Sequence, residues 1–368
     1  MKRAKVDRRE LSATEEKNIG TNTWLVAPGV WRLKDIFVNV YFIQDREATG
    51  FVMVDAGLKS TAQKVRNLVA EVFGKGSKPT AIVMTHAHFD HRGSLIELAE
   101  EWGVPVYCHH QERPYLTGQS SYPPPDPSVG GGMMALLSFT YPKKPINAET
   151  YLKELPEDGT IPELEDWTWM HTPGHTPGHI SLFREKDGVL IAGDAFVTTM
   201  QESVLAVATQ KQFVCGPPKY FTPDWGAAAR SVKQLAALEP NVITTGHGRA
   251  MYGDEARKQL HKLSKEFWRV GIPATGRYVQ EAASFNKDGV PVHIPKAKGT
   301  MLKKIAVAAA LFAVAYFVSK QRKKSSGFIE KKLLDKISGS LKAGALGTLG
   351  ATAPASPALP SLPAIPAI

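Results

Sequence analysis

The densest group of side chains able to bind a metal lies in Thr85–His91, with the sequence THAHFDH. Imidazole nitrogen and carboxylate oxygen together suit zinc or a similar first-row metal. In an extended segment His86 and His88 project to one side, because side-chain direction repeats every second residue. Where the chain curls toward a helix, Asp90 and His91 turn toward a second position close by. The stretch predicts two metal sites, and a polar loop with ordinary histidines is the plain alternative.

The residues around this cluster predict a strand before it and a helix after it. Residues 81–84 (AIVM) are apolar and strand-like, and residues 93–101 carry apolar side chains at helical spacing. Three further patches repeat one pattern, in which a predicted strand ends in a metal-capable residue beside glycine. These patches are residues 172–179 (TPGHTPGH), 193–194 (GD) and 245–248 (TGHG).

Strand and helix patterns come in two successive rounds along the chain. The predicted strands cover residues 23–26, 30–33, 38–43, 51–54, 81–84, 104–108, 167–170, 180–183, 189–192 and 241–244. Helices are predicted over residues 61–73, 93–101, 224–238 and 254–268, with Asp224 as a helix N-cap. Two rounds of this kind predict a β-rich sandwich with helices outside, built as two halves.

Residues 111–160 interrupt this rhythm with proline and glycine clusters, notably Tyr122–Pro127 and Gly130–Gly132. A long segment of this kind predicts a lid or a substrate wall, and a surface excursion without a role is the alternative. The residues predicted to shape a substrate pocket are apolar or aromatic. They are Tyr115, Tyr122, Met133, Met134 and Phe139.

The net charge of +10 belongs to one end of the 368-residue chain. Residues 296–368 hold 12 Lys and Arg and 2 Asp and Glu, which leaves 33 of each sign in residues 1–295. A neutral body does not indicate the basic surface that nucleic-acid binding favours, so we expect a small-molecule substrate and no nucleic acid. The two cysteines form no CxxC pair and favour a reducing compartment.

The four polar patches, HxHxDH, TPGHTPGH, GD and TGHG, resemble the metallo-β-lactamase superfamily and occur in that family's order. They are most similar to its glyoxalase II and lactonase-like branches. The resemblance covers residues 21–268 and implies an αββα sandwich with a centre of two metal ions at one edge. It implies divalent ions, with zinc first and iron or manganese as alternatives.

Carried over residue by residue, the resemblance implies seven ligands. One metal is held by His86, His88 and His175, the other by Asp90, His91 and His247, and Asp194 bridges them. Asp55, at the end of its predicted strand, supports the ligands from behind. His171 and His179 are expected to pack or to support ligands. The histidines outside the matched blocks are expected to be ordinary: His109, His110, His261 and His293.

The chemistry implied by the resemblance is hydrolysis of an ester, thioester or lactone. Two cations sharing a water lower its pKa to about 7, and the resulting hydroxide attacks a carbonyl carbon. A metal stabilises the oxyanion, and Asp90 carries a proton to the leaving group. Residues 248–252 do not resemble the glutathione-binding region of glyoxalase II. Two alternatives stay open: a persulfide dioxygenase-like enzyme with one iron, and a membrane-tethered binding or scaffold protein with a vestigial metal site.

The chain is predicted to continue beyond the catalytic domain into a membrane-associated tail. Residues 1–20 form a polar arm, 21–268 the catalytic domain, 269–300 an extension, 301–324 a transmembrane or interfacial helix, and 325–368 a basic, then Ala/Pro-rich tail. The uncharged run Ile305–Val318 has 14 residues between lysines, short of the roughly 20 that a span needs. Spanning and interfacial helices both stay open. Because Met1–Asn22 contains no apolar signal segment, we expect a cytoplasmic catalytic domain.

Overall fold

The computed structural model describes residues 15–297, which contain two large β-sheets and a small two-stranded one. The first large sheet has eight strands in the order of the sequence, antiparallel from β1 to β5 and parallel from β5 to β8. Its strands are β1 (Lys17–Gly20), β2 (Thr23–Ala27), β3 (Val30–Asp35), β4 (Val38–Gln44), β5 (Phe51–Val54), β6 (Ala81–Val83), β7 (Val106–Cys108) and β8 (Leu152–Glu154).

The second large sheet has five strands in the order β13-β12-β11-β10-β9. Only its β11–β12 pair is parallel. Its strands are β9 (Trp167–His171), β10 (Ile180–Arg184), β11 (Val189–Ile191), β12 (Val242–Thr244) and β13 (Met251–Tyr252), and β14 (Ser284–Phe285) pairs with β15 (Pro291–His293) to form the small sheet.

Helices connect the parallel strands and fill the longer segments. The α-helices are α1 (Ala62–Val72), α2 (Leu95–Trp102), α3 (Arg113–Leu116), α4 (Met133–Leu136), α5 (Val204–Thr209), α6 (Trp225–Ala236), α7 (Gly253–Lys265) and α8 (Phe267–Val270). Short 3-10 helices are η1 (His110–Glu112), η2 (Pro127–Val129), η3 (Ser138–Thr140), η4 (Glu149–Tyr151) and η5 (Lys219–Phe221). The side chain of Asp224 accepts a hydrogen bond from Ala227 N at 2.9 Å, which confirms it as the N-cap of α6.

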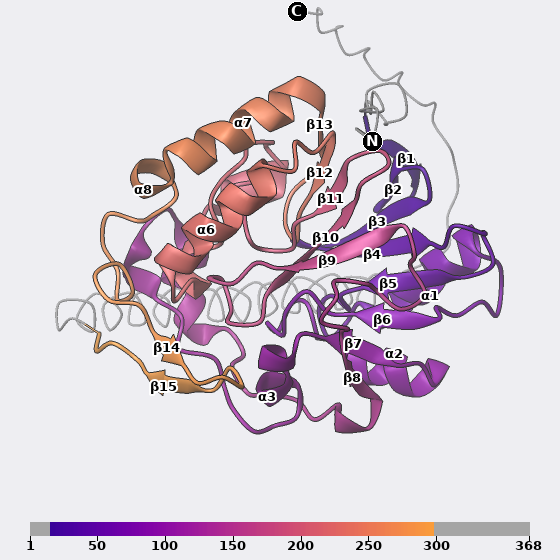
Figure 1. Ribbon diagram of the computed structural model, residues 1–368, viewed down its shortest axis with the longest axis horizontal. Coiled ribbons are helices and arrows are strands. Elements are labelled where there is room, and N and C mark those ends of the chain that lie inside the picture. Colours follow the sequence, from indigo (N-terminus) through magenta and orange to yellow (C-terminus); the bar gives the residue numbers. More distant parts are fainter. Residues whose placement is uncertain (1–14, 298–368) are drawn as a thin grey trace, which may run out of the picture. The chain divides into compact units, whose positions relative to one another are not determined.

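Three apolar cores hold these elements in four layers (Figure 1). The central core packs the two sheets face to face, for example Val54 of β5 and Leu182 of β10. One outer core joins α1 and α2 to the first sheet, and the other joins α6 and α7 to the second. Strands covered on both faces are apolar throughout, and every residue of β5, β6 and β11 is buried. The predicted αββα sandwich is therefore confirmed.

Three boundaries differ from those predicted. Lys17–Gly20, in the predicted arm, pair with β2, and the neighbouring Glu16 forms a buried ion pair with Arg32 at 2.8 Å. Inside the segment 111–160, β8 adds an eighth strand beside β7. Its three residues, LKE, carry no apolar pattern, so periodicity could not reveal it. Residues of the predicted extension also enter the fold, because Ala283 is buried in the outer core of α6 and α7.

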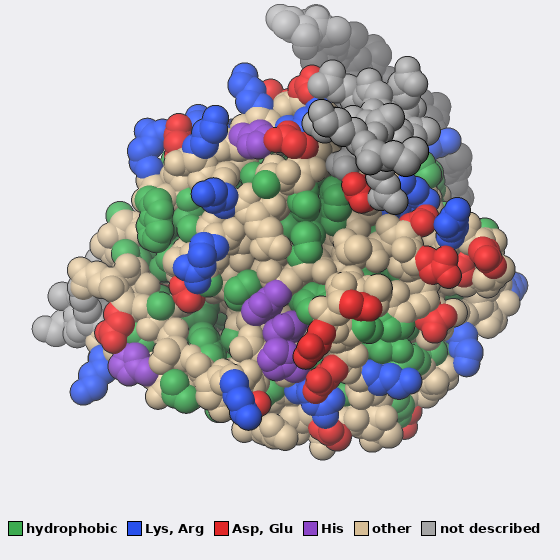
Figure 2. Space-filling model, in the orientation of Figure 1, with side chains coloured by type: hydrophobic (Ala, Val, Ile, Leu, Met, Phe, Trp, Pro, Cys, Tyr) green, Lys and Arg blue, Asp and Glu red, His purple; other side chains and the backbone are tan. Residues whose placement is uncertain are grey.

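The charged side chains of the described residues are mixed in sign on the face shown in Figure 2. Lys and Arg lie among Asp and Glu there, as equal numbers in residues 1–295 would produce. Within residues 15–297 no helix has the length and apolar character needed to cross a membrane. The predicted membrane helix, residues 301–324, lies outside the described residues.

Candidate metal centre

The histidine cluster follows β6 as a tight loop that leads into α2. The backbone N–H groups of His91 and Arg92 both donate to His88 O, at 3.0 and 3.1 Å. Thr85 at the start of the loop donates twice to Asp55 at the end of the neighbouring strand β5, from its backbone N–H and its hydroxyl, both at 2.8 Å. The loop is thus fixed at both ends and buried.

The other candidate ligands come from loops at the ends of three strands of the second sheet. His175 follows β9, Asp194 follows β11 and His247 follows β12. Gly246 allows the last loop to approach, because a Cβ there would lie 2.0 Å from Asp194 Oδ1 and 2.7 Å from His91 Cε1. Glycine is the one residue that fits such a contact, so the TGHG pattern reflects packing as well as chemistry.

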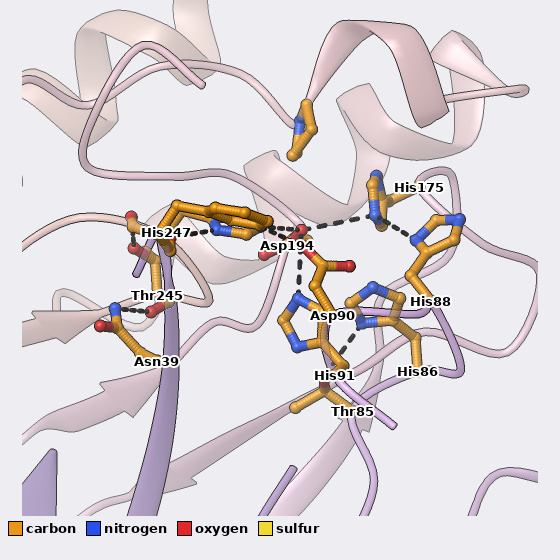
Figure 3. Close-up of polar contacts among 12 residues, drawn as sticks. Asn39, Thr85, His86, His88, Asp90, His91, His175, Asp194, Thr245 and His247 are labelled. Carbon is orange, nitrogen blue, oxygen red and sulfur yellow. Dashed lines mark hydrogen bonds and ion pairs between the residues drawn. The ribbon is translucent and has the colours of Figure 1, made fainter. Parts of the chain in front are cut away.

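The structure brings all seven predicted ligands together as two trios of buried side chains beside Asp194 (Figure 3). The three-histidine trio is His86, His88 and His175, and the mixed trio is Asp90, His91 and His247. In each trio the ligand atoms lie within 4.8 Å of one another. His88 Nδ1 and His175 Nε2 are 2.9 Å apart, and His247 Nε2 is 3.6 Å from Asp90 Oδ2.

Asp194 lies between the trios and reaches both. Its Oδ2 is 3.5 Å from His175 Nε2 in the three-histidine trio, and 3.1 Å from His247 Nε2 and 3.6 Å from His91 Nε2 in the mixed trio. His86, His91 and Asp194 also form a trio of their own within the same 4.8 Å limit. The Asp194 carboxylate therefore lies close to four of the five histidines in the two trios, namely His86, His91, His175 and His247.

Several of these buried atoms lack hydrogen-bond partners. Within the described chain, His86 Nε2, His91 Nε2 and Asp194 Oδ1 are buried and have no hydrogen-bond partner. Unpaired buried polar atoms are costly and rare in folded proteins. Nitrogen lone pairs and carboxylate oxygens that converge without partners fit a cation, and five histidines with two aspartates suit zinc, iron or manganese. The residues present thus fit the metal ions that the fold implies.

Outer partners orient the ligand rings, as is usual for metal-binding histidines. His91 Nδ1 donates to Asp55 Oδ2 at 2.8 Å, and His247 Nδ1 donates to Phe37 O at 2.7 Å. Both contacts leave Nε2 of the ring facing inward. Asp55 has a φ of +61°, a conformation that is strained outside glycine and concentrates at functional sites.

The His247 loop has further support from the first sheet. Asn39 Nδ2 donates to Thr245 O and to Gly248 O, each at 2.8 Å, and Tyr41 OH donates to Thr245 O at 2.7 Å. Asn39 and Thr245 appear at the left of Figure 3. Buried polar residues on β4 therefore hold a ligand loop more than 200 residues away in sequence.

The two trios differ in their electrostatics. Burial, with the charges of neighbouring histidines, lowers the pKa of His86 and His88 well below the usual range, and burial lowers the pKa of His175 to about 3. Burial also acts to lower the pKa of His91 and His247, but nearby carboxylates together outweigh it and raise both pKa values: Asp194 and Asp55 act on His91, and Asp194 and Asp90 act on His247. Burial raises the pKa of Asp90 against the attraction of those two rings.

The residues predicted to shape a pocket take different positions. Tyr122 lies against His88, with ring centroids 4.5 Å apart, and Tyr115 stacks behind it at 3.7 Å. Tyr115 is almost fully buried and donates to Gly289 O, so it backs Tyr122 instead of facing an open pocket. Met134 is half-buried beside Tyr141, Met133 is exposed and Phe139 is half-buried.

Besides Tyr122, which the sequence predicted, two aromatic residues near the trios were missed by sequence reasoning. Phe221 stacks on His88 at 4.4 Å between ring centroids, and Tyr141 lies 5.9 Å from Phe221 and 5.5 Å from Phe89. Burial and the charge of Asp90 raise the pKa of Tyr141 to about 12. Nothing in the local sequence around Phe221, Tyr141 or Phe89 indicates that these three rings meet.

Sequence reasoning also left Glu112 out and His179 without a stated partner. Glu112 is fully buried, and burial raises its pKa to about 7 against four hydrogen bonds. His179 Nε2 accepts the backbone N–H of Asp194 at 2.8 Å, so it supports a candidate ligand. His171 instead stacks on His109 at 4.2 Å and bonds to Pro177 O at 2.7 Å, outside both trios. The doubled TPGH block could have singled out His179.

Fold and site together define a metal-binding α/β sandwich, and the family comparison agrees. The chain belongs to the metallo-beta-lactamase superfamily, because the model of that family matches residues 33–247. Two Bacillus subtilis proteins described as probable metallo-hydrolases are similar to it. YflN is 47% identical over 239 residues, covering 65% of this chain and 90% of that protein, and YybB is 26% identical over 223 residues, covering 60% and 86%.

Two solved structures are similar to this chain at lower identity. The protein TTHA1623 in a di-iron-bound form is 25% identical with a TM-score of 0.43, covering 65% of this chain and 96% of that chain. The B3 metallo-beta-lactamase BLEG-1 is 24% identical with a TM-score of 0.44, covering 61% and 93%. Superfamily membership and the histidine–aspartate cluster mark this chain as a metallo-hydrolase family member with a candidate metal centre.

Proposed function

We propose that this protein is a metal-dependent hydrolase of an ester, thioester or lactone, with two divalent metal ions in its centre. The observation that carries the proposal is the pair of buried trios joined by Asp194. His86, His88 and His175 would hold one ion, Asp90, His91 and His247 the other, and Asp194 both. The proposal names zinc first because imidazole and carboxylate together suit it, with iron and manganese as alternatives.

Bound divalent ions supply a water whose pKa falls from 15.7 to about 7, and they stabilise negative charge on a carbonyl oxygen. The chain's own residues supply orientation. Asp55 and the Phe37 carbonyl fix the rings of His91 and His247 through their Nδ1 atoms. Locked ligands need no rearrangement during the reaction, which is the condition for electrostatic stabilisation of a transition state.

Asp90 is the residue that we propose to move a proton to the leaving group. Its carboxylate is buried within the mixed trio, with Oδ2 3.6 Å from His247 Nε2. After burial, its charge is the other cause that raises the pKa of Tyr141, so the carboxylate lies near the aromatic wall. A carboxylate beside both the metal ligands and the substrate wall is well placed for general acid–base work.

The substrate wall that we propose is apolar and aromatic. Phe221 stacks on His88, and Tyr141 lies beside both Phe221 and Phe89. The predicted Met133, Met134 and Phe139 precede Tyr141 in the same segment of chain. Small-molecule sites generally combine such walls with a few polar groups. An ester or lactone with an apolar substituent next to its carbonyl fits this description.

Metal analysis of the purified full chain tests the proposal, combined with hydrolysis assays on lactones, S-acylglutathiones and β-lactams. We expect close to two metal ions per chain and turnover of at least one substrate class. One iron per chain with oxygen consumption would instead identify a persulfide dioxygenase-like enzyme. A full metal complement without turnover of any substrate would favour the binding or scaffold alternative.

We also propose that the tail attaches the protein to the cytoplasmic face of a membrane. The support is the sequence alone, in which the apolar run Ile305–Val318 lies between lysine clusters. Basic flanks attract anionic lipid, and the apolar run would insert into it. Resistance to alkaline carbonate would indicate a spanning helix, and release by carbonate or salt an interfacial one.

A further inference from the structure

A buried carboxylate behind the three-histidine trio is unused by the proposed chemistry. Glu112 ends η1, and its side chain has no exposed surface. Within residues 15–297 it forms no ion pair with a Lys, Arg or His. An unpaired buried charge is costly unless hydrogen bonds satisfy it, so its partners indicate what it is for.

Each oxygen of Glu112 accepts hydrogen bonds from a different part of the centre. Oε2 accepts the backbone N–H of Ala87 at 3.0 Å and the Tyr122 hydroxyl. Oε1 accepts the Thr176 hydroxyl at 2.7 Å and the backbone N–H of Gly178 at 2.9 Å. Two backbone N–H groups can only donate, so this arrangement requires an acceptor on both oxygens, as an ionised carboxylate provides.

Three of these four partners, Ala87, Thr176 and Gly178, lie within three residues of a histidine of the three-histidine trio. Ala87 stands between His86 and His88, and Thr176 directly follows His175. The two loops come from different sheets, and Glu112 is bonded to both of them. The Glu112 cluster is defined as Glu112, Ala87, Tyr122, Thr176 and Gly178. It links the loop after β6 of the first sheet to the loop after β9 of the second sheet.

The close fit of this cluster depends on glycine. A Cβ at Gly178 would lie 2.8 Å from Glu112 N and 2.9 Å from Glu112 Cγ. Any larger residue would push the His175 loop away from η1. Tyr122 closes the other side, because its ring lies against His88 and its hydroxyl also accepts from Ala87 N at 2.9 Å.

We propose that Glu112 is a positioning residue that sets the distance between the His86–His88 loop and the His175 loop. It thereby sets the metal affinity of the three-histidine trio, a role that rests on the proposed function for the presence of a metal there. The mixed trio has no bond to Glu112 among the described residues, and it depends on Asp55 and Asn39 instead. The proposal therefore predicts an effect on one metal site and not on the other.

Glu112→Gln is the informative variant, because it keeps the size of the side chain. In glutamine, an NH2 group replaces one of the two side-chain oxygens and cannot accept a hydrogen bond from a backbone N–H. The variant therefore loses its hydrogen bond either to Ala87 N or to Gly178 N. Loss of an outer partner of metal ligands typically weakens metal binding by about 10- to 100-fold. Glu149→Gln is the matched control, since that glutamate is exposed and pairs with Arg113 of the neighbouring helix α3.

The test measures Zn²⁺ affinity of the metal-free full chain by chelator competition, and Co²⁺ binding by visible absorption. Single-site variants His175→Ala and His247→Ala assign the Co²⁺ bands to the two trios. We expect Glu112→Gln to weaken the three-histidine site by about 10- to 100-fold, with the mixed site within about threefold and Glu149→Gln unchanged. Thermal unfolding of the metal-free proteins checks the fold, and Thr176→Val replaces Glu112→Gln if the latter does not fold.

Three results would overturn the inference. Unchanged affinity at both sites would show that the cluster does not position ligands. An equal loss at both sites would show a general effect on the fold. If the unaltered chain bound neither Zn²⁺ nor Co²⁺, the proposed metal centre would be wrong and the role of Glu112 would fall with it.

Discussion

The two trios of the candidate centre differ in charge, and each would hold a cation in a different way. The three-histidine trio carries no charge of its own, and burial keeps its rings neutral by lowering their pKa. The mixed trio has its own carboxylate, Asp90, and lies closer to Asp194. Carboxylates that raise the pKa of His91 and His247 would favour a metal cation at the same nitrogens.

We expect the metal affinity of the three-histidine trio to depend mainly on ligand geometry, and that of the mixed trio mainly on charge. Neutral ligands depend on accurate placement, because each contributes only a lone pair, and the Glu112 cluster supplies that placement. The mixed trio gains from electrostatic attraction in a buried site, where charges interact strongly. We therefore expect the two sites to respond differently to metal-ligand, outer-partner and wall substitutions.

The largest effect is expected from Asp194→Ala, because Asp194 borders both trios. Both metal ions should be lost, and kcat/KM should fall by about a thousandfold or more, since metal activation contributes several kcal/mol and each 1.36 kcal/mol is tenfold. Metal analysis and steady-state kinetics measure this. Loss of a single metal would mean that Asp194 serves one trio alone.

His247→Ala and Asp90→Ala should each remove one metal and cost several orders of magnitude in hydrolysis, because a ligand and its share of charge disappear together. His175→Ala should remove the other metal. The fold should survive in all three, as judged by circular dichroism. Near-normal turnover in either mixed-trio variant on a good substrate would show that the second site is assigned wrongly.

Asp55→Asn should weaken the mixed trio by about 10- to 100-fold in metal affinity. The three-histidine trio should lose less, because Asp55 reaches it only through Thr85, whose hydroxyl lies 3.0 Å from His86 Nδ1. Asp55 accepts from both donors of Thr85 and from His91, and an amide nitrogen would have to replace one of these acceptor positions. Chelator competition at each site measures the loss. Glu112→Gln and Asp55→Asn should thus have opposite site preferences, the first weakening mainly the three-histidine site and the second mainly the mixed site. If Asp55→Asn weakened mainly the three-histidine site, the proposed difference between the trios would be wrong.

Substitutions in the aromatic wall should change substrate binding without changing metal content. Phe221→Ala should raise KM by about tenfold for substrates with an apolar substituent, since removing a contact of 1 to 3 kcal/mol has that size. Deleting residues 117–139 would also shift substrate preference, but it removes Tyr122 and should disturb the three-histidine site as well. Equal kinetics for Phe221→Ala across the substrate panel would exclude this wall from recognition.

The smallest effect on both trios is expected from truncation after residue 300. Metal content and kcat/KM should stay within about twofold of the full chain, because every ligand and outer partner lies before that point. The truncated protein should lose membrane association, measured by fractionation and carbonate extraction. If full-length and truncated proteins were both wholly in the soluble fraction, membrane attachment through the tail would be excluded.

Much of the fold was readable from local pattern. The apolar strands of both sheets, α1, α6 with its Asp224 cap, and α7 were predicted within a few residues, because buried strands and amphipathic helices carry their own periodicity. Strand β8 was missed for the opposite reason, since its residues are mostly exposed. Residues 269–297 carry weak local signals, and their place follows from contacts such as Ala283 in the outer core.

The sequence by itself determined which residue types stand at the strand ends, and the resemblance of their order implied seven ligands that the structure brings together. Only the tertiary structure decided what surrounds them. Glu112, Tyr141, Phe221 and Asn39 stand in unremarkable stretches, and each meets its partner across dozens to hundreds of residues. A metal ligand can be recognised from its neighbours in sequence, because a loop must present it. A supporting carboxylate or an aromatic wall is defined by the residues that pack on it. Because those residues come from distant parts of the chain, the contact produces no recognisable pattern in the local sequence.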